Sequence, residues 1–254
     1  MKKNKKLSFL IILTIVFVFA GTSTGEKNST TMTMGDKLYA EGSMESLRQS
    51  VEIYKQITKD DPQSYEASWK TARSCRKITR MAVIGELNDL KQICLQYGKL
   101  GMEMAQRATE MEPDKVEGHY YYAVNVGGYA KGANILSVLG KGLKEKARQS
   151  LEKAYKIDKE YEGYVLLMHI GLYYEVLPWF AGRDEEKALE HYLEALRLMP
   201  ADAPYRPQLH VLAGKLMLER GVEKDRARQI LQETAESGIE YFSRKARKIL
   251  AESG

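Results

Sequence analysis

Small and bulky apolar residues recur along the chain at helical spacing, and each recurrence ends at a residue that stops a helix. In each recurrence a small residue is followed four positions later by a bulky one. Three positions after that comes a small or apolar residue, and five positions further on comes a residue that ends the helix. The recurrences are Ser50-Tyr54-Ile57-Pro62, Gly101-Ala105-Ala108-Pro113, Ala147-Leu151-Ala154-Lys159, Ala188-Tyr192-Ala195-Pro200 and Ala227-Leu231-Thr234-Ile239. Offsets of 0, 4 and 7 lie on one helix face, so each copy predicts a helix that packs closely against a neighbour.

A second helical segment follows each stop, beginning near residues 65, 116, 161 and 205. The alternation of the two helix types is the register of tetratricopeptide repeats, although several consensus positions are degenerate. No segment shows the alternating pattern of a strand. The sequence therefore predicts an all-α fold of stacked antiparallel helical hairpins, a degenerate tetratricopeptide-like solenoid.

The repeat spacing is interrupted twice. One helix, over residues 86–112, is predicted to be unusually long. Between Pro113 and Ala147, several glycines are expected to break the chain into short helices: Gly127, Gly128, Gly132, Gly140 and Gly142. A regular solenoid does not need this Gly-broken helical insertion, so we expect it to cap or narrow a groove.

The stretch after Pro113 holds the first candidate binding residues. Pro113 ends one helix, and the next begins near Val116. Four successive ring side chains, from His119 to Tyr122, cannot all face one core, so some are expected to line a second surface. His119, Tyr122 and Asn125 are candidates for a ligand or partner site. The alternatives are a hydrogen bond near the helix start for His119 and a buried amide that holds helices in register for Asn125.

A second group of candidates is aromatic and consists of Tyr129, Tyr173, Trp179 and Phe180. The last three flank Leu177-Pro178, where a helix is expected to end. A tyrosine stripe at helical spacing is typical of a core. Trp179 and Phe180, in contrast, follow the break, and in a loop they need a surface to cover, which a partner or ligand could supply.

Composition favours an exported helical protein. The chain has 254 residues and a formal charge of +5, of which Lys2, Lys3, Lys5 and Lys6 supply four, so no nucleic-acid-binding surface is indicated. An apolar run over residues 7–20 follows these lysines and resembles a signal peptide cleaved after Ala20, with an uncleaved membrane anchor as the alternative. Thr22 stands where a lipidated cysteine would be needed. Residues 21–35 are expected to form a flexible lead, and residues 36–254 a single helical-repeat domain, in the periplasm or cell envelope.

No catalytic constellation is found, and no metal or cofactor is expected. The four histidines, His119, His169, His191 and His210, are far apart without other ligands at metal-binding spacing. Cys75 and Cys94 lie about equally far from a predicted turn near residues 84–85. An exported protein allows a disulfide between them, whereas the spacing of helix axes favours two buried thiols.

Several segments together resemble the TRAP-transporter T-component family. They are E-G-H-Y-Y-Y-A-V-N-V-G-G-Y-A, the Gly-broken insertion, L-K-E-K-A-R-Q-S-L-E-K-A-Y-K-I-D, H-I-G-L-Y-Y-E-V-L-P-W and G-R-D-E-E-K-A-L-E-H-Y-L-E-A-L. The resemblance covers about residues 45–235. It implies a non-enzymatic accessory protein of an organic-acid transporter that binds the periplasmic solute-binding component and holds a small apolar ligand. A helical-repeat family of animals also carries a His-aromatic-Tyr-Ala element, but the bacterial-looking signal favours the transporter family.

Two functions are therefore carried forward. The first is the transporter accessory protein, and the alternative is a general tetratricopeptide scaffold for protein assembly in the cell envelope. Homo-oligomer formation is left open.

Overall fold

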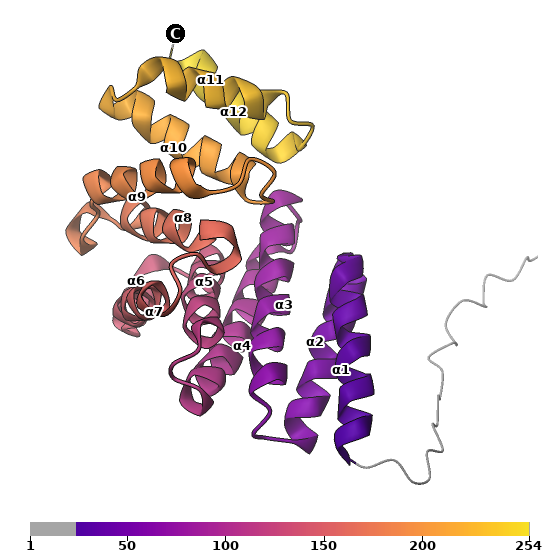
Figure 1. Cartoon of the computed structure of the whole chain (residues 1–254). Helices are drawn as coiled ribbons and strands as arrows, with labels where there is room; N and C mark the ends of the chain where they lie inside the picture. Colours follow the sequence, from indigo (N-terminus) through magenta and orange to yellow (C-terminus); the bar gives the residue numbers. More distant parts are fainter. Residues whose placement is uncertain (1–23, 254) are drawn as a thin grey trace, which may run out of the picture.

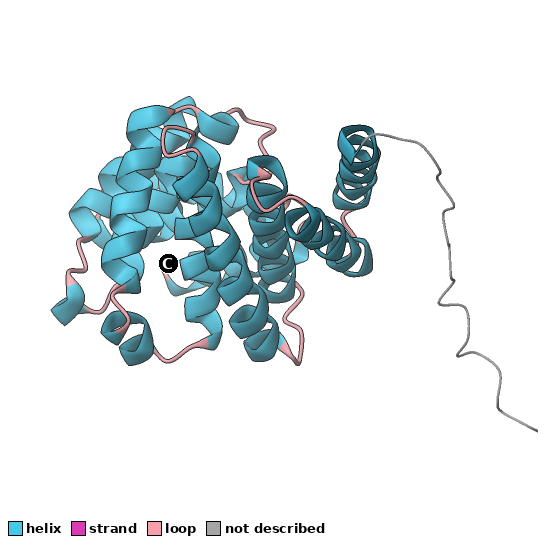
Figure 2. Cartoon of the chain, turned by 90° about the horizontal axis from the view of Figure 1, so that it is seen from below, coloured by secondary structure: helices cyan, strands magenta, loops and turns pink. Residues whose placement is uncertain are grey.

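The computed structural model describes residues 24–253, and these form twelve α-helices and one short 3-10 helix joined by loops and turns (Figures 1 and 2). The first half contains α1 (Thr24–Glu41), α2 (Met44–Asp60), α3 (Tyr65–Ile84), α4 (Leu90–Met111), α5 (Val116–Gly132) and α6 (Ile135–Gly140). The second half contains α7 (Leu143–Ile157), α8 (Tyr161–Val176), η1 (Trp179–Ala181), α9 (Glu185–Leu198), α10 (Arg206–Arg220), α11 (Lys224–Ala235) and α12 (Glu240–Glu252). The predicted all-α fold is confirmed.

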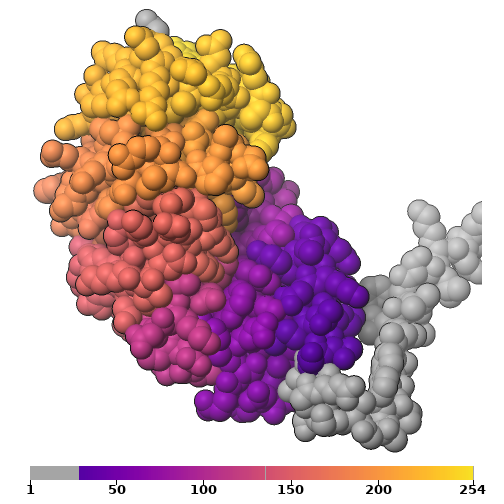
Figure 3. Space-filling view, in the orientation of Figure 1, coloured from indigo at the N-terminus to yellow at the C-terminus, as the bar shows by residue number. Residues whose placement is uncertain are grey.

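The helices pack as successive hairpins, α1 with α2, α3 with α4, α5 with α7, α8 with α9 and α10 with α11. The second helix of each hairpin carries one copy of the repeated pattern. In the space-filling view the hairpins follow one another in sequence order, from indigo at one end to yellow at the other (Figure 3). Helix α12 has no hairpin partner of its own among residues 24–253 and packs on α11 and α10.

Local sequence explains where the helices begin and end. The side chains of Ser43, Ser64 and Asp184 accept hydrogen bonds from the first-turn backbone amides of α2, α3 and α9. At the other end, α2 and α4 stop just before Asp61-Pro62 and Glu112-Pro113, because the residue before a proline is driven out of the helical region. The predicted starts near residues 65, 116, 161 and 205 agree with α3, α5, α8 and α10.

Glycines allow a very close approach between α4 and α5. A Cβ atom on Gly98 would lie 2.6 Å from the backbone nitrogen of Tyr129, and one on Gly132 would lie 2.5 Å from the carbonyl oxygen of Lys91. Asn125 of α5 fills the space left by Gly101 of α4, since a Cβ atom there would lie 2.3 Å from the amide oxygen. The two helices can pack this closely only because these positions lack side chains.

The insertion differs from the prediction. Helix α5 runs through Gly127 and Gly128 without a break and ends at Gly132, so only the later glycines separate short helices. Gly128 faces α3, where a Cβ atom would lie 2.9 Å from the hydroxyl oxygen of Thr79. Tertiary packing at Gly128 therefore helps to keep the helix continuous despite the low helix propensity of glycine.

The N-terminal region also differs from the prediction where it is described. Residues 24–35 were expected to belong to a flexible lead, yet they form most of α1. Asp36 anchors this helix, because its carboxylate accepts hydrogen bonds from Tyr54 (2.8 Å) and Lys70 (2.6 Å). The predicted signal peptide lies outside the described residues. Among residues 24–253 no helix has the length and apolar content needed to cross a membrane.

The last helix contacts the second hairpin, far from it in sequence. Arg244 of α12 forms a 2.6 Å ion pair with Glu86 in the turn between α3 and α4. Ile84, at the end of α3, packs against an apolar cluster that includes Phe242. Figure 1 shows the yellow α12 above the upper end of α3. This contact encloses a space between the last helix and the second hairpin.

Candidate functional site

A groove of about 400 Å³ lies on the face shared by the first helices of the later hairpins. Its walls come from α3, α5, α8, α10 and α12, and from the insertion at α6 and α7. Apolar side chains form most of it, and they include Val83, Ile84, Val124, Val126, Val138, Leu139, Leu151, Leu172, Val176, Leu177, Val211, Leu212 and Phe242. A volume of this size is at the lower end of ligand sites in proteins, which run from about 300 to 1,000 Å³.

The charged side chains that line this groove are all basic. They are Arg76 and Arg80 of α3, Lys131 of α5, Lys144 of α7 and Lys245 of α12. None of the described residues in its lining is an aspartate or glutamate. The groove therefore has a positive potential over an apolar surface, and its low-dielectric walls strengthen that potential.

Arginines follow one face of α3 at helical spacing, at positions 73, 76 and 80. Arg73 pairs with Asp36 of α1, at 3.3 Å. Arg76 instead lies 3.4 Å from Nε2 of His169, and Arg80 lies over the rings of Tyr205 (4.6 Å) and Phe242 (5.9 Å). Among residues 24–253, neither Arg76 nor Arg80 has a carboxylate within ion-pair distance, and the Nε atoms of both are buried without a hydrogen-bond partner.

The electrostatics of this region reflect burial and the nearby positive charges. Burial lowers the pKa of Arg80, and the positive charge of Arg76 lowers it further. Burial also holds the pKa of His169 well below its usual range, again with Arg76 adding to the effect. His169 is therefore neutral at physiological pH. Its Nδ1 donates to the carbonyl of Val165 (3.1 Å), which leaves Nε2 to accept from Arg76.

The candidates on α5 have structural contacts outside the groove. His119 is buried, and its Nε2 lies 2.8 Å from the carbonyl oxygen of Pro113, at the start of the helix. Asn125 is buried and donates to the carbonyls of Ala72 (3.0 Å) and Tyr121 (2.8 Å). Tyr122 is buried in the main core, and the hydroxyl of Tyr129 accepts a hydrogen bond from Lys141 (3.0 Å). A binding role for these four residues stays a prediction.

The candidates near the end of α8 divide between the groove and the outer surface. Tyr173 lines the groove. Trp179 and Phe180 lie in η1 with 85% and 58% of their surface exposed, and their rings pack edge to face at 5.8 Å. Val176, one turn before them, is exposed and also lines the groove. Of the seven predicted residues, Tyr173 alone is part of the groove lining.

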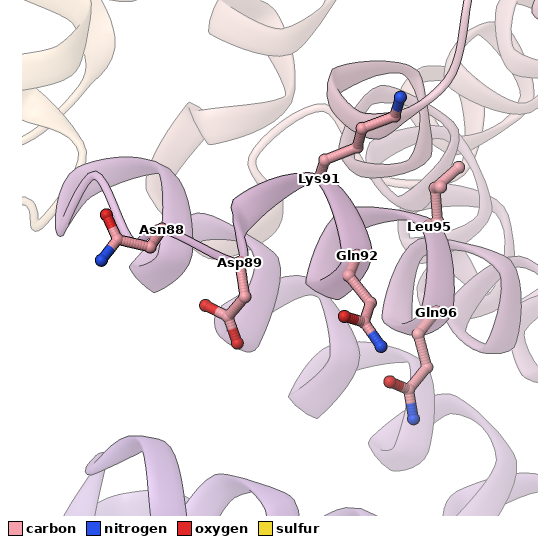
Figure 4. Close-up of a pocket in the computed structure, with 6 residues that line it drawn as sticks. All are labelled: Asn88, Asp89, Lys91, Gln92, Leu95 and Gln96. Atoms are coloured by element: carbon pink, nitrogen blue, oxygen red, sulfur yellow. The ribbon is translucent and has the colours of Figure 1, made fainter.

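A second hollow lies at the start of α4 and lacks the features of a binding site. Its lining consists of Asn88, Asp89, Lys91, Gln92, Leu95 and Gln96. Figure 4 shows that these side chains come from one short segment and point in different directions. A hollow walled by one segment cannot surround a ligand, so the groove is the better candidate.

The two cysteines are free and buried, Cys75 on α3 and Cys94 on α4. Burial raises the pKa of both thiols, so each behaves as a small apolar side chain. The sequence leaves open a disulfide or two buried thiols, and in the structure both cysteines are free thiols. No cluster of three or more potential metal-ligating side chains occurs in residues 24–253.

Sequence reasoning missed the cationic residues of the groove. One signal was available, because Arg73, Arg76 and Arg80 recur at intervals of three and four and so predict a positive stripe on one helix face. Lys131, Lys144 and Lys245 give no comparable signal. These lysines line the same groove as Arg76 and Arg80 only because of how the hairpins stack, and no spacing in the sequence predicts that arrangement.

Comparison with known proteins identifies the family. The family model described as regulator of microtubule dynamics protein 1-3 matches residues 31–174, more than half of the chain. The chain belongs to this family. The resemblance to TRAP-transporter T components is therefore wrong, and with it the accessory transport function, the solute-binding partner and the apolar ligand that it implied.

A solved structure supports the repeat fold. The chain is similar to TTC0263, a thermophilic tetratricopeptide-repeat protein of Thermus thermophilus, with 21% identity and a TM-score of 0.58 over 88% of this chain and 99% of that one. It also matches a structure of MamA protein, with 18% identity and a TM-score of 0.49 over 88% of this chain and 96% of that one. No curated protein matches the chain. At these identities the likeness to TTC0263 establishes the fold alone.

Proposed function

We propose that this member of the regulator of microtubule dynamics family is a non-enzymatic scaffold that binds a segment of a partner protein in its groove. The observation that supports this most directly is the construction of the groove, since helices from several successive hairpins share one apolar, charged surface. Repeat folds use such shared surfaces for extended contacts with partners. A peptide segment combines apolar side chains with polar and charged groups, which is the chemistry the lining offers.

The family description indicates which partner to test first. It names regulation of microtubule dynamics, so assembled tubulin is the first defined partner to test. Proteins that act together with microtubules are the wider class. The exported scaffold predicted from the sequence remains a proposal, because the signal segment lies outside the described residues.

A groove-filling substitution tests this function. Gly127 of α5 is exposed and lines the groove, and a Cβ atom there would have no neighbour within 4 Å. Gly127→Trp therefore adds a large side chain to the groove without displacing the core. Gly140, at the end of α6, also has nothing within 4 Å but lies outside the lining, so Gly140→Trp is the matched control.

Two measurements follow. A library of random dodecapeptides is selected on the wild-type protein, and the enriched peptides are titrated against both variants; co-sedimentation with assembled tubulin is measured in parallel. We expect Gly127→Trp to abolish the binding that Gly140→Trp retains. If every peptide and the tubulin polymer bind Gly127→Trp as tightly as wild type, the groove is not the binding site and the proposal fails.

A further inference from the structure

The cationic side chains of helix α3 differ in whether a carboxylate pairs with them. In its first half, Lys70 and Arg73 face Asp36 of α1, at 2.6 and 3.3 Å, and Lys70 also pairs with Glu66 at 2.6 Å. In its second half, Arg76 and Arg80 line the groove and have no carboxylate partner within residues 24–253. Asp36 of α1 thus supplies the anion along the first half of α3, whereas no described residue supplies one along the second half.

We propose that the partner segment bound in the groove is acidic, with a carboxylate that pairs with Arg76 and Arg80 and apolar side chains that fill the space beside them. The inference rests on the proposed function and gives its ligand a chemical class. The carboxylate of the segment would pair with the arginines in the second half of α3, as Asp36 pairs with Lys70 and Arg73 in the first half. Arginine forms paired hydrogen bonds with carboxylates, and such charge-assisted contacts are the strong ones in a partly desolvated site.

The remaining lining supports an extended acidic segment. Lys131, Lys144 and Lys245 lie on three further helices, α5, α7 and α12. The positive charge is therefore distributed around the groove and is not gathered at one point, as a single lipid headgroup would require. Apolar residues from α8 and α10 lie between these helices, and they offer room for the hydrophobic side chains of an amphipathic segment.

The N-terminal segment of the chain itself does not suit this site. Residues 1–23 lie outside the described part, and their charged side chains are the four lysines at positions 2, 3, 5 and 6. A basic segment would repel Arg76 and Arg80 at close range. Charge complementarity thus favours a separate, acidic partner over the chain's own beginning.

The test removes the two charges and keeps the hydrogen-bonding side chains. In the double variant R76Q/R80Q both arginines become glutamine, and in the control R226Q/R228Q the same change is made on α11, outside the groove. Dodecapeptides selected on the wild type, and shown to depend on the groove by their loss in Gly127→Trp, are titrated by fluorescence anisotropy at low and high sodium chloride. Phosphatidylserine–phosphatidylcholine vesicles are titrated in the same way.

The expected result is that groove-dependent peptides are rich in Asp and Glu next to large apolar residues. R76Q/R80Q weakens their binding by about tenfold or more, high salt weakens it as well, and R226Q/R228Q binds as wild type. Thermal unfolding of R76Q/R80Q is measured in parallel to show that the variant is folded, because the change also removes the Arg76–His169 hydrogen bond and the contacts of Arg80 with the rings of Tyr205 and Phe242.

Three outcomes would overturn the inference. Groove-dependent peptides that are neutral or basic, or an unchanged Kd in R76Q/R80Q, would leave the scaffold function intact and refute the acidic ligand. Vesicles that bind through the groove in place of peptides would show a lipid occupant. If no peptide depends on the groove at all, the proposed function itself fails, and this inference fails with it.

Discussion

At the scale of single residues, the buried histidines are expected to make the stability of the protein depend on pH. His210 of α10 accepts a hydrogen bond at Nε2 from Arg206 (3.0 Å), and its Nδ1 lies 3.1 Å from the hydroxyl oxygen of Thr234. Because Arg206 can only donate, Nε2 must be unprotonated, and the proton is on Nδ1. Protonation of Nε2 would replace this hydrogen bond with repulsion between two cations.

We therefore predict that His210 makes the protein less stable in acid. Burial, with the adjacent charge of Arg206, lowers the pKa of His210 to about 4. Between pH 6.5 and 4 the unfolded chain binds a proton at this position and the folded chain does not, so stability falls as the pH falls through this window. The contribution lost between pH 7.5 and 5 is about 2 kcal/mol.

The variant His210→Gln tests this. Glutamine can accept from Arg206 and donate to Thr234, yet it does not titrate. Urea unfolding at a series of pH values should give a shallower decline for the variant, with part of the slope retained because the pKa of His169 is lowered in the same direction. An identical decline in both proteins would mean that His210 is protonated in the folded state.

At the scale of helices, the α4–α5 interface depends on missing side chains. We predict that Gly98→Ala destabilises the protein by about 1–3 kcal/mol, because the new methyl group would meet the backbone of Tyr129 at 2.6 Å and backbone cannot rotate away. Gly127→Ala, on the same pair of helices but with nothing within 4 Å, should instead stabilise by up to about 1 kcal/mol. Chemical denaturation of the two variants measures the difference, and equal effects would contradict the close approach.

The helices also show what the sequence can and cannot predict. Helix boundaries at Asp61, Glu112 and Val116 were predictable, because prolines and first-turn residues act locally. The continuity of α5 through Gly128 could not be predicted from the sequence, because it depends on packing against Thr79 of another helix. The candidate site follows the same division. Tyr173, a candidate because it flanks the helix break at Leu177-Pro178, lies in the groove lining. Lys245 joins Arg76 there only through the arrangement of the whole stack.

At the scale of the whole molecule, the contact between α12 and the end of α3 joins the last helix to the second hairpin across the groove. An uninterrupted solenoid is stabilised only by neighbouring repeats. Here Phe242 of α12, which is 4% exposed, packs in the same apolar cluster as Ile84 of α3. The ion pair between Arg244 and Glu86 spans the same contact, with about half of each side chain exposed.

The last prediction is that the apolar contact, not the ion pair, holds α12 against the end of α3. Phe242→Ala should lower the free energy of unfolding by about 3–5 kcal/mol, because it leaves a cavity where a buried ring was. Arg244→Ala should cost less than about 1 kcal/mol, since water already screens the exposed pair. Urea denaturation measures both values, and amide hydrogen exchange locates the effect. Exchange in residues 80–86 should accelerate in Phe242→Ala, although this segment is distant in sequence, and stay unchanged in Arg244→Ala. If both variants lost stability equally, the ion pair would contribute as much as the apolar contact. If exchange accelerated only within α12, then α12 would not be coupled to α3, and the stack would behave as an open solenoid.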